Sequence, residues 1–205
     1  MILLFFLATI SGVVLYPQLP SKLPTHWNIY GQIDSYMPKN IAIWLIPGLI
    51  LLMIVGFQIM PALDPKKEKY KLFRQEWEII QLIFVGFFSY LHGIILYLSL
   101  NPTKNIRPLM FIGFGTLFIL LGNYLSKVRQ NYFLGIKTPW ALSDEDNWNK
   151  THRFASWCFV IAGVIILFEA YFIWLAPVVV FASIFSAAII PTVYSYLIFK
   201  NKKLS

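Results

Sequence analysis

Long apolar runs constrain this chain more than any other feature of its sequence. A helix rises about 1.5 Å per residue and the hydrocarbon core of a bilayer is about 30 Å thick, so a spanning helix needs roughly 20 mostly apolar residues. Runs that approach or reach this length cover residues 1–16, 41–60, 79–100, 108–125, 154–174 and 177–199. We therefore predict an all-α polytopic membrane protein with six transmembrane helices.

Composition supports this class and excludes others. Of the 205 residues, 58% are hydrophobic and 13% charged, whereas soluble domains carry about a quarter charged residues. Such a hydrophobic chain is not intrinsically disordered. With Cys158 as its single cysteine, the chain has neither an internal disulfide framework nor a cysteine-based zinc site. The first apolar run lacks the basic start and cleavage site of a signal peptide, so we expect it to remain as a helix.

The distribution of basic residues predicts the orientation in the membrane. Thirteen of the 17 Lys and Arg residues fall after the second run, after the fourth run or in the tail, and the other four are Lys22, Lys39, Lys104 and Arg107. Because basic residues concentrate on the cytoplasmic side, we expect both termini to be cytoplasmic.

The predicted outer loop, residues 17–40, carries the first group of candidate functional residues. Its many prolines favour a stiff, extended path. The candidate residues that face outward are His26, Trp27, Asn28, Gly31 and Asp34. Two interpretations remain open: an interfacial loop anchored by its aromatic rings, or a small recognition surface. A metal at His26 and Asp34 is disfavoured, because two ligands are too few for a closed site.

The longest cytoplasmic loop, residues 126–153, carries the second group. Gly135 suggests a turn, and Pro139 should hold Thr138 in an extended conformation. Ser143 has the position of a helix N-cap, followed by acidic residues that suit the first turn. The helix should continue into the fifth span, with Asp144, Trp148 and His152 on one face.

That face has two possible roles. One is an amphipathic helix at the inner headgroups, anchored by Trp140 and Trp148. The other is a docking site for a cytoplasmic partner, built from the two tryptophans with His152 and Arg153.

Two ionisable residues fall within predicted spans, where they are costly and usually functional. His92 and Glu169 should reach similar depth and could form a hydrogen-bonded pair. Alternatively, Glu169 reaches the outer interface alone and His92 bonds a backbone carbonyl. Asn123, near the inner end of the fourth span, could bond across helices or cap the loop.

Two motifs in this sequence resemble those of a known family. The segment "GIKTPWALSDEDNWNKTHR" from Gly135 to Arg153, preceded by "GNY" at 122–124 and by Asn131, is similar to the signature of the SdpI family. The segment "LPTHWNIYGQIDSY", residues 23–36, resembles the domain of unknown function DUF1648 that often precedes it. The signature residues present are Asn123, Asn131, Gly135, Lys137, Thr138, Pro139, Trp140, Trp148, Thr151, His152 and Arg153.

The resemblance divides the chain into three regions. Residues 1–60 form a DUF1648-like segment of two spans with the outer loop. Residues 61–107 hold a basic cytoplasmic loop and the third span. Residues 108–205 form the SdpI-like region of three spans around the loop at 126–153.

The resemblance also implies a function. It implies an integral protein of the cell membrane, in a Gram-positive bacterium, that protects its host from a secreted antimicrobial peptide toxin. It further implies a receptor that captures a cytoplasmic winged-helix autorepressor, so the expected partners are the lipid bilayer, the toxin and this repressor. We predict no cofactor, and nothing in the sequence supports direct contact with nucleic acid.

Two other classes of protein are alternatives to this one. An enzyme is disfavoured, because the sequence has no nucleophile elbow, no HExxH motif and no phosphate-binding loop. We therefore predict no catalytic residues and no metal site. A small membrane transporter or channel is the alternative that remains, although the sequence shows no internal repeat and few charges within spans.

Overall fold

A computed structural model describes residues 1–28, 30–172 and 176–204, and it is mostly helical. Its α-helices are α1 (Ile2–Leu15), α2 (Lys39–Leu63), α3 (Arg74–Leu100), α4 (Arg107–Leu125), α5 (Pro139–Ser143), α6 (Glu145–Phe172) and α7 (Ala176–Leu204). The 3₁₀-helices are η1 (Tyr16–Gln18) and η2 (Lys67–Phe73), and the strands are β1 (Lys22–Trp27) and β2 (Ile33–Pro38).

Within the described ranges, five helices are long and apolar enough to cross a membrane. These are α2, α3, α4, α6 and α7. With 14 residues, α1 is about 21 Å long at 1.5 Å per residue, which is shorter than the hydrocarbon core. The prediction of a polytopic helical membrane protein is confirmed at this level: five long apolar helices and a shorter one.

Two helices extend beyond the expected spans. α2 continues through Pro61 to Leu63, three residues beyond the predicted apolar run 41–60. α3 begins at Arg74, five residues before the apolar run, and Arg74 Nε donates to Glu78 Oε1 at 2.9 Å, one turn along the helix. Hydropathy marks the lipid-crossing part of a helix, whereas pairs of this kind extend it into water.

The all-α prediction is wrong for the outer loop. β1 and β2 form a two-stranded antiparallel hairpin, with Lys22 opposite Pro38 and Trp27 opposite Ile33. The sheet has only two strands, so each has a free edge where proline is tolerated. Of the prolines that suggested an extended path, Pro24 and Pro38 lie in the hairpin strands, whereas Pro17 lies in η1 and Pro20 precedes β1.

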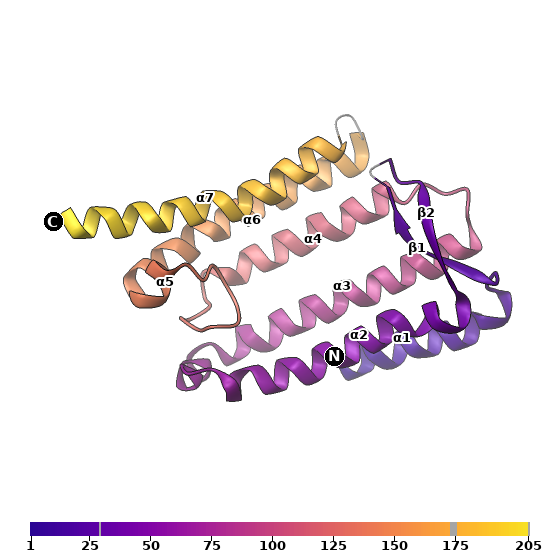
Figure 1. Cartoon of the computed structure of the whole chain (residues 1–205), viewed down its shortest axis with the longest axis horizontal. Helices are drawn as coiled ribbons and strands as arrows, with labels where there is room; N and C mark the ends of the chain where they lie inside the picture. Colours follow the sequence, from indigo (N-terminus) through magenta and orange to yellow (C-terminus); the bar gives the residue numbers. More distant parts are fainter. Residues whose placement is uncertain (29, 173–175, 205) are drawn as a thin grey trace.

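The helices form two groups. Figure 1 shows α1, α2 and α3 on one side and α4, α6 and α7 on the other, with α3 beside α4. The tightest helix pair is α4 with α6. A Cβ on Gly115 would lie 2.8 Å from the Gly163 carbonyl oxygen, and one on Gly122 would lie 2.9 Å from that of Ser156. Small residues permit such close approach in membrane helices.

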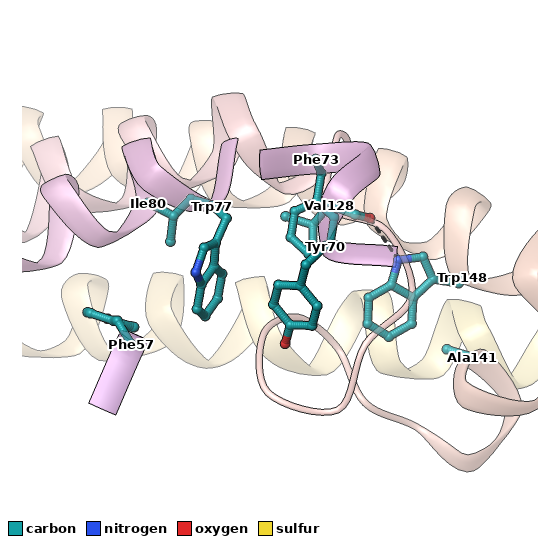
Figure 2. Packing of buried hydrophobic residues seen from close by; sticks show 8 residues of the cluster. All are labelled: Phe57, Tyr70, Phe73, Trp77, Ile80, Val128, Ala141 and Trp148. Atoms are coloured by element: carbon teal, nitrogen blue, oxygen red, sulfur yellow. Dashed lines mark hydrogen bonds between the residues drawn. The ribbon is translucent and has the colours of Figure 1, made fainter. Parts of the chain in front are cut away.

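The hairpin and the signature loop lie at opposite ends of the bundle (Figure 1). We call these the hairpin end and the loop end. At the loop end a cluster of buried apolar side chains joins both helix groups, and Figure 2 shows its members: Phe57, Tyr70, Phe73, Trp77, Ile80, Val128, Ala141 and Trp148.

Candidate functional sites at the two ends of the bundle

The hairpin carries the first candidate site. His26 Nδ1 lies 2.5 Å from Asp34 Oδ1 across the two strands, and both side chains are exposed. The turn is organised by Asn28, whose Oδ1 accepts from the backbone N–H groups of Tyr30 at 2.9 Å and Gln32 at 3.0 Å. Gly31 has a φ of 77°, a conformation that glycine adopts without strain.

The structure brings most of the predicted outward-facing residues to one place. His26, Trp27, Asn28 and Gly31 line a cavity of about 740 Å³ between the hairpin and the helices. Asp34 does not line this cavity and instead holds the His26 ring.

Trp148 and His152 are buried in the signature loop. Neither side chain is exposed. Trp148 Nε1 donates to the Val128 carbonyl at 2.9 Å (Figure 2), and its ring stacks on the His152 ring at 3.9 Å. His152 Nε2 accepts the Ile136 N–H at 3.0 Å. The face that we expected to contact the headgroups or a partner therefore packs inside the protein.

Gly135 is required by this packing. Its φ is 118°, and a Cβ here would overlap His152 Nε2. The glycine therefore lets the loop backbone lie directly against the stacked Trp148 and His152 rings.

A second set of polar contacts connects the loop to α7. Thr138 is extended, with a ψ of 152°, and caps α5 through its Oγ1, which accepts from the Ala141 N–H at 3.1 Å. The same oxygen lies 2.8 Å from Ser195 Oγ. Asn147 Nδ2 donates to the Ser195 carbonyl at 2.9 Å, and the buried Thr151 Oγ1 donates to Asn147 Oδ1 at 3.0 Å.

A third set connects the loop to the first helix group. Asn131 is fully buried, and its Oδ1 accepts from the backbone N–H groups of Phe133 at 2.9 Å and Leu134 at 2.7 Å. Asp64, just after α2, accepts from Tyr70 Oη at 2.9 Å and from the Tyr132 N–H at 2.8 Å.

Lys66 completes this junction. Its Nζ donates to Gln130 Oε1 at 2.5 Å and to the Leu142 carbonyl at 3.0 Å. Burial, followed by the neighbouring charge of Lys69, lowers the pKa of Lys66 from its ordinary value. The amino group of Lys66 therefore lies against the backbone of the signature loop.

Sequence reasoning missed Asp64, Tyr70, Gln130, Asn147 and Ser195. The sequence signal is weak: Asp64 lies four residues after one apolar run, and Ser195 interrupts another. Their partners are up to 68 residues away along the chain, so only the fold reveals their role.

Four of the signature residues remain accessible. Lys137, Pro139 and Arg153 are exposed, as is Asn123 on α4. Asn123 therefore faces outward instead of bonding across helices. Trp140 is half-buried and packs against α7, with its ring 5.2 Å from that of Tyr196.

The expected N-cap is displaced by one residue. Ser143 ends α5, and Asp144 caps α6 by accepting from the Asp146 N–H at 3.1 Å. The expectation that this helix continues into the fifth apolar run is confirmed, since α6 is unbroken from Glu145 to Phe172.

The proposed His92–Glu169 pair does not form. His92 Nε2 and Glu169 Oε2 are each buried without a hydrogen-bond partner. The prediction of this pair is wrong because the two residues belong to different helix groups. His92 lies against α1, near Gly12, whereas Glu169 is on α6. Among the described residues, no group of three or more His, Cys, Asp or Glu side chains could hold a metal ion.

The long apolar helices, with a hairpin at one end and the signature loop at the other, define a multi-pass helical membrane protein. Comparison with known proteins shows which family this membrane protein resembles. Residues 127–195 match the SdpI/YfhL protein family, and residues 3–51 match the domain of unknown function DUF1648. The first match runs from the signature loop to Ser195, the α7 residue that bonds Thr138.

A curated relative matches most of the chain. It is the immunity protein SdpI of Bacillus subtilis (strain 168), 29% identical over 171 residues, which cover 83% of this chain and 80% of the relative. No solved structure matches the chain significantly. The resemblance to the SdpI family, with an N-terminal DUF1648 segment, is therefore confirmed.

Proposed function

We propose that this protein is an integral membrane immunity protein that protects its host cell from a secreted antimicrobial peptide toxin. The observation that carries the proposal is the match to an immunity protein over 83% of the chain. The structure agrees with this proposal in one respect. The two matched regions contribute the hairpin and the signature loop, which lie at opposite ends of the bundle.

In this proposal the hairpin end faces outward and meets the toxin. Support comes from the basic residues, of which thirteen of 17 lie in segments that would be cytoplasmic. The exposed His26–Asp34 pair and the neighbouring Trp27, Asn28 and Gly31 form the toxin-facing surface. The cell membrane of a Gram-positive bacterium is the proposed location.

We further propose that the loop end is the signalling surface. The exposed signature residues Lys137, Pro139 and Arg153 would contact a cytoplasmic winged-helix autorepressor. The buried signature residues, Trp148 and His152 above all, would act indirectly by fixing the shape of that surface.

Expression in a toxin-sensitive strain that carries a repressor-controlled reporter tests both roles. We expect the wild-type protein to increase survival under challenge with the secreted peptide. A His26→Ala/Asp34→Ala variant should lose protection. A Lys137→Ala/Arg153→Ala variant should keep protection and lose reporter induction, and membrane abundance of each variant is the control.

The two roles fail separately in this design. Absence of protection by an abundant wild-type protein, against every toxin peptide of the class tested, contradicts the immunity function. Protection without any toxin-dependent reporter response contradicts only the receptor function.

A further inference from the structure

The cavity beneath the hairpin has apolar walls. Its lining includes Ile46 from α2, Ile95 from α3, Phe114 from α4 and Ile184 from α7. On α4 it extends from Arg107 to Phe114, seven residues and therefore about 10 Å at 1.5 Å per residue. The apolar part thus continues well below the hairpin, into the level of the spanning helices.

A cation stands at the mouth of this cavity. Arg107 begins α4 and is half-buried beneath the hairpin turn, where a Cβ on Gly31 would lie 2.8 Å from Arg107 Cγ. Its Nε is buried without a hydrogen-bond partner.

The Arg107 guanidinium forms no ion pair with the described residues. The carboxylate on the hairpin, Asp34, contacts His26 and does not line this cavity. Burying a guanidinium nitrogen without an acceptor is costly, so the site favours an anionic group.

We propose that this cavity binds an anionic phospholipid, with one acyl chain between the helices and the phosphate on Arg107. Guanidinium groups bind phosphate oxygens with paired hydrogen bonds. The cavity supplies an apolar space below and a charge above, which matches an amphiphile with an acidic head. Trp27 at the mouth is of the type that settles at the headgroup level.

The position of the cavity makes it reachable from the bilayer. Its walls include the Phe181 side chain of α7, which is 51% exposed. The apolar wall of the cavity therefore reaches the outer surface of α7, where an acyl chain can enter. This inference does not depend on the proposed immunity function.

Native mass spectrometry of the purified full chain tests the proposal. The protein in neutral detergent is given equal amounts of phosphatidylglycerol and phosphatidylcholine with identical acyl chains. A basic residue near the headgroups contributes about 1 kcal/mol toward an anionic lipid, which corresponds to a preference of about fivefold for phosphatidylglycerol.

Three variants and one matched control locate the site. Arg107→Gln should abolish the preference, and Arg107→Lys should retain part of it. Lys104→Gln is the matched control, because it removes a positive charge from the connection that leads into α4, but Lys104 is exposed and does not line this cavity. Ile184→Trp should reduce retention of phosphatidylglycerol at least several-fold by filling the apolar part.

Several outcomes would overturn the assignment. These are equal retention of the two lipids by the wild-type protein, equal effects of Arg107→Gln and Lys104→Gln, or unchanged retention in a monodisperse Ile184→Trp variant. A folded wild-type protein that retains neither lipid would also refute it and would leave the cavity to another occupant, such as an apolar peptide.

Discussion

At the loop end, individual polar residues stabilise the loop conformation through buried hydrogen bonds. Asn131, Thr151 and His152 are all buried, and each makes hydrogen bonds within the loop or to its own helix. A buried polar group that loses its partner costs about 1–3 kcal/mol. Such residues specify a single loop conformation, whatever partner the exposed surface contacts.

Gly135→Ala should destabilise the protein by about 1–3 kcal/mol, the usual range for a strained backbone conformation. The added Cβ would overlap His152 Nε2 at a φ of 118°. Unfolding in mixed micelles, followed by tryptophan fluorescence, measures the change.

Gly86→Ala on α3 is the control for Gly135→Ala, since nothing lies within 4 Å of a Cβ there. Alanine also favours a helix over glycine by about 1 kcal/mol. Equal stability of the two variants would contradict the contact between Gly135 and His152.

Among the helices, α4 and α6 depend on small residues. On α4, Gly115 and Gly122 are seven residues apart, and on α6 the same spacing separates Ser156 and Gly163. These residues face one another in antiparallel order, and Ser156 Oγ donates to the Gly122 carbonyl.

Gly163→Ala should push α4 and α6 apart and destabilise the bundle by about 1–3 kcal/mol, as expected for overpacking. The new Cβ would lie 2.6 Å from the Gly115 carbonyl oxygen. The free energy of unfolding in micelles gives the measurement, with Gly93→Ala as control because its Cβ meets nothing within 4 Å. An unchanged value for Gly163→Ala would refute the close approach.

The C-terminal end of α7 is held to the start of α6 in a pH-dependent way. Lys202 Nζ donates to Asp144 Oδ2 at 2.9 Å, and this hydrogen bond holds the pKa of Asp144 below its ordinary value of 3.8. A carboxyl whose pKa is lowered by folding stabilises the folded state above its ordinary pKa, and that contribution disappears as the pH falls through the lowered value.

We therefore expect the tail to stay attached at neutral and mildly acidic pH and to loosen only below 3.8. A spin label at Asn201→Cys, with Cys158→Ser, reports the mobility of the tail. Asp144→Asn should raise this mobility at neutral pH, and Glu145→Gln, which removes the partner of Lys69 instead, should not. Loosening of the wild-type tail near neutral pH would contradict this assignment.

At the scale of the whole molecule, each end has a cavity between the same three helices. The cavity at the hairpin end and a second cavity of about 480 Å³ at the loop end both lie between α3, α4 and α7. Gly135 and Thr138 line the second. A ligand that binds unequally to two arrangements of the helix groups could therefore influence both ends.

Sidedness is the prediction that belongs to this scale. In a variant with Cys158→Ser, a cysteine at Ser35 on the hairpin should react with a membrane-impermeant maleimide on intact cells. A cysteine at Lys137 should react only after permeabilisation. Both replaced residues are exposed, so the side of the membrane on which each lies decides whether the reagent reaches it. Reaction of both cysteines from the same side would exclude the proposed orientation.

The sequence by itself determined the class of protein. Apolar length and charge distribution are local properties, so the bilayer, acting as a solvent, selects helices from them without reference to tertiary contacts. The same holds for the unbroken α6 and for the extended Thr138, because proline and neighbouring residues act along the chain.

Only the tertiary structure decided which residues are surface and which are core. A spacing of four residues places Trp148 and His152 on one face of a helix. The loop around Gly135 folds over that face and buries it. Equal depth suggested that His92 meets Glu169, yet the grouping of the helices separates them. Contacts such as Asp64 with Tyr132 join residues 68 positions apart, and no local pattern encodes which distant partner a buried polar atom finds.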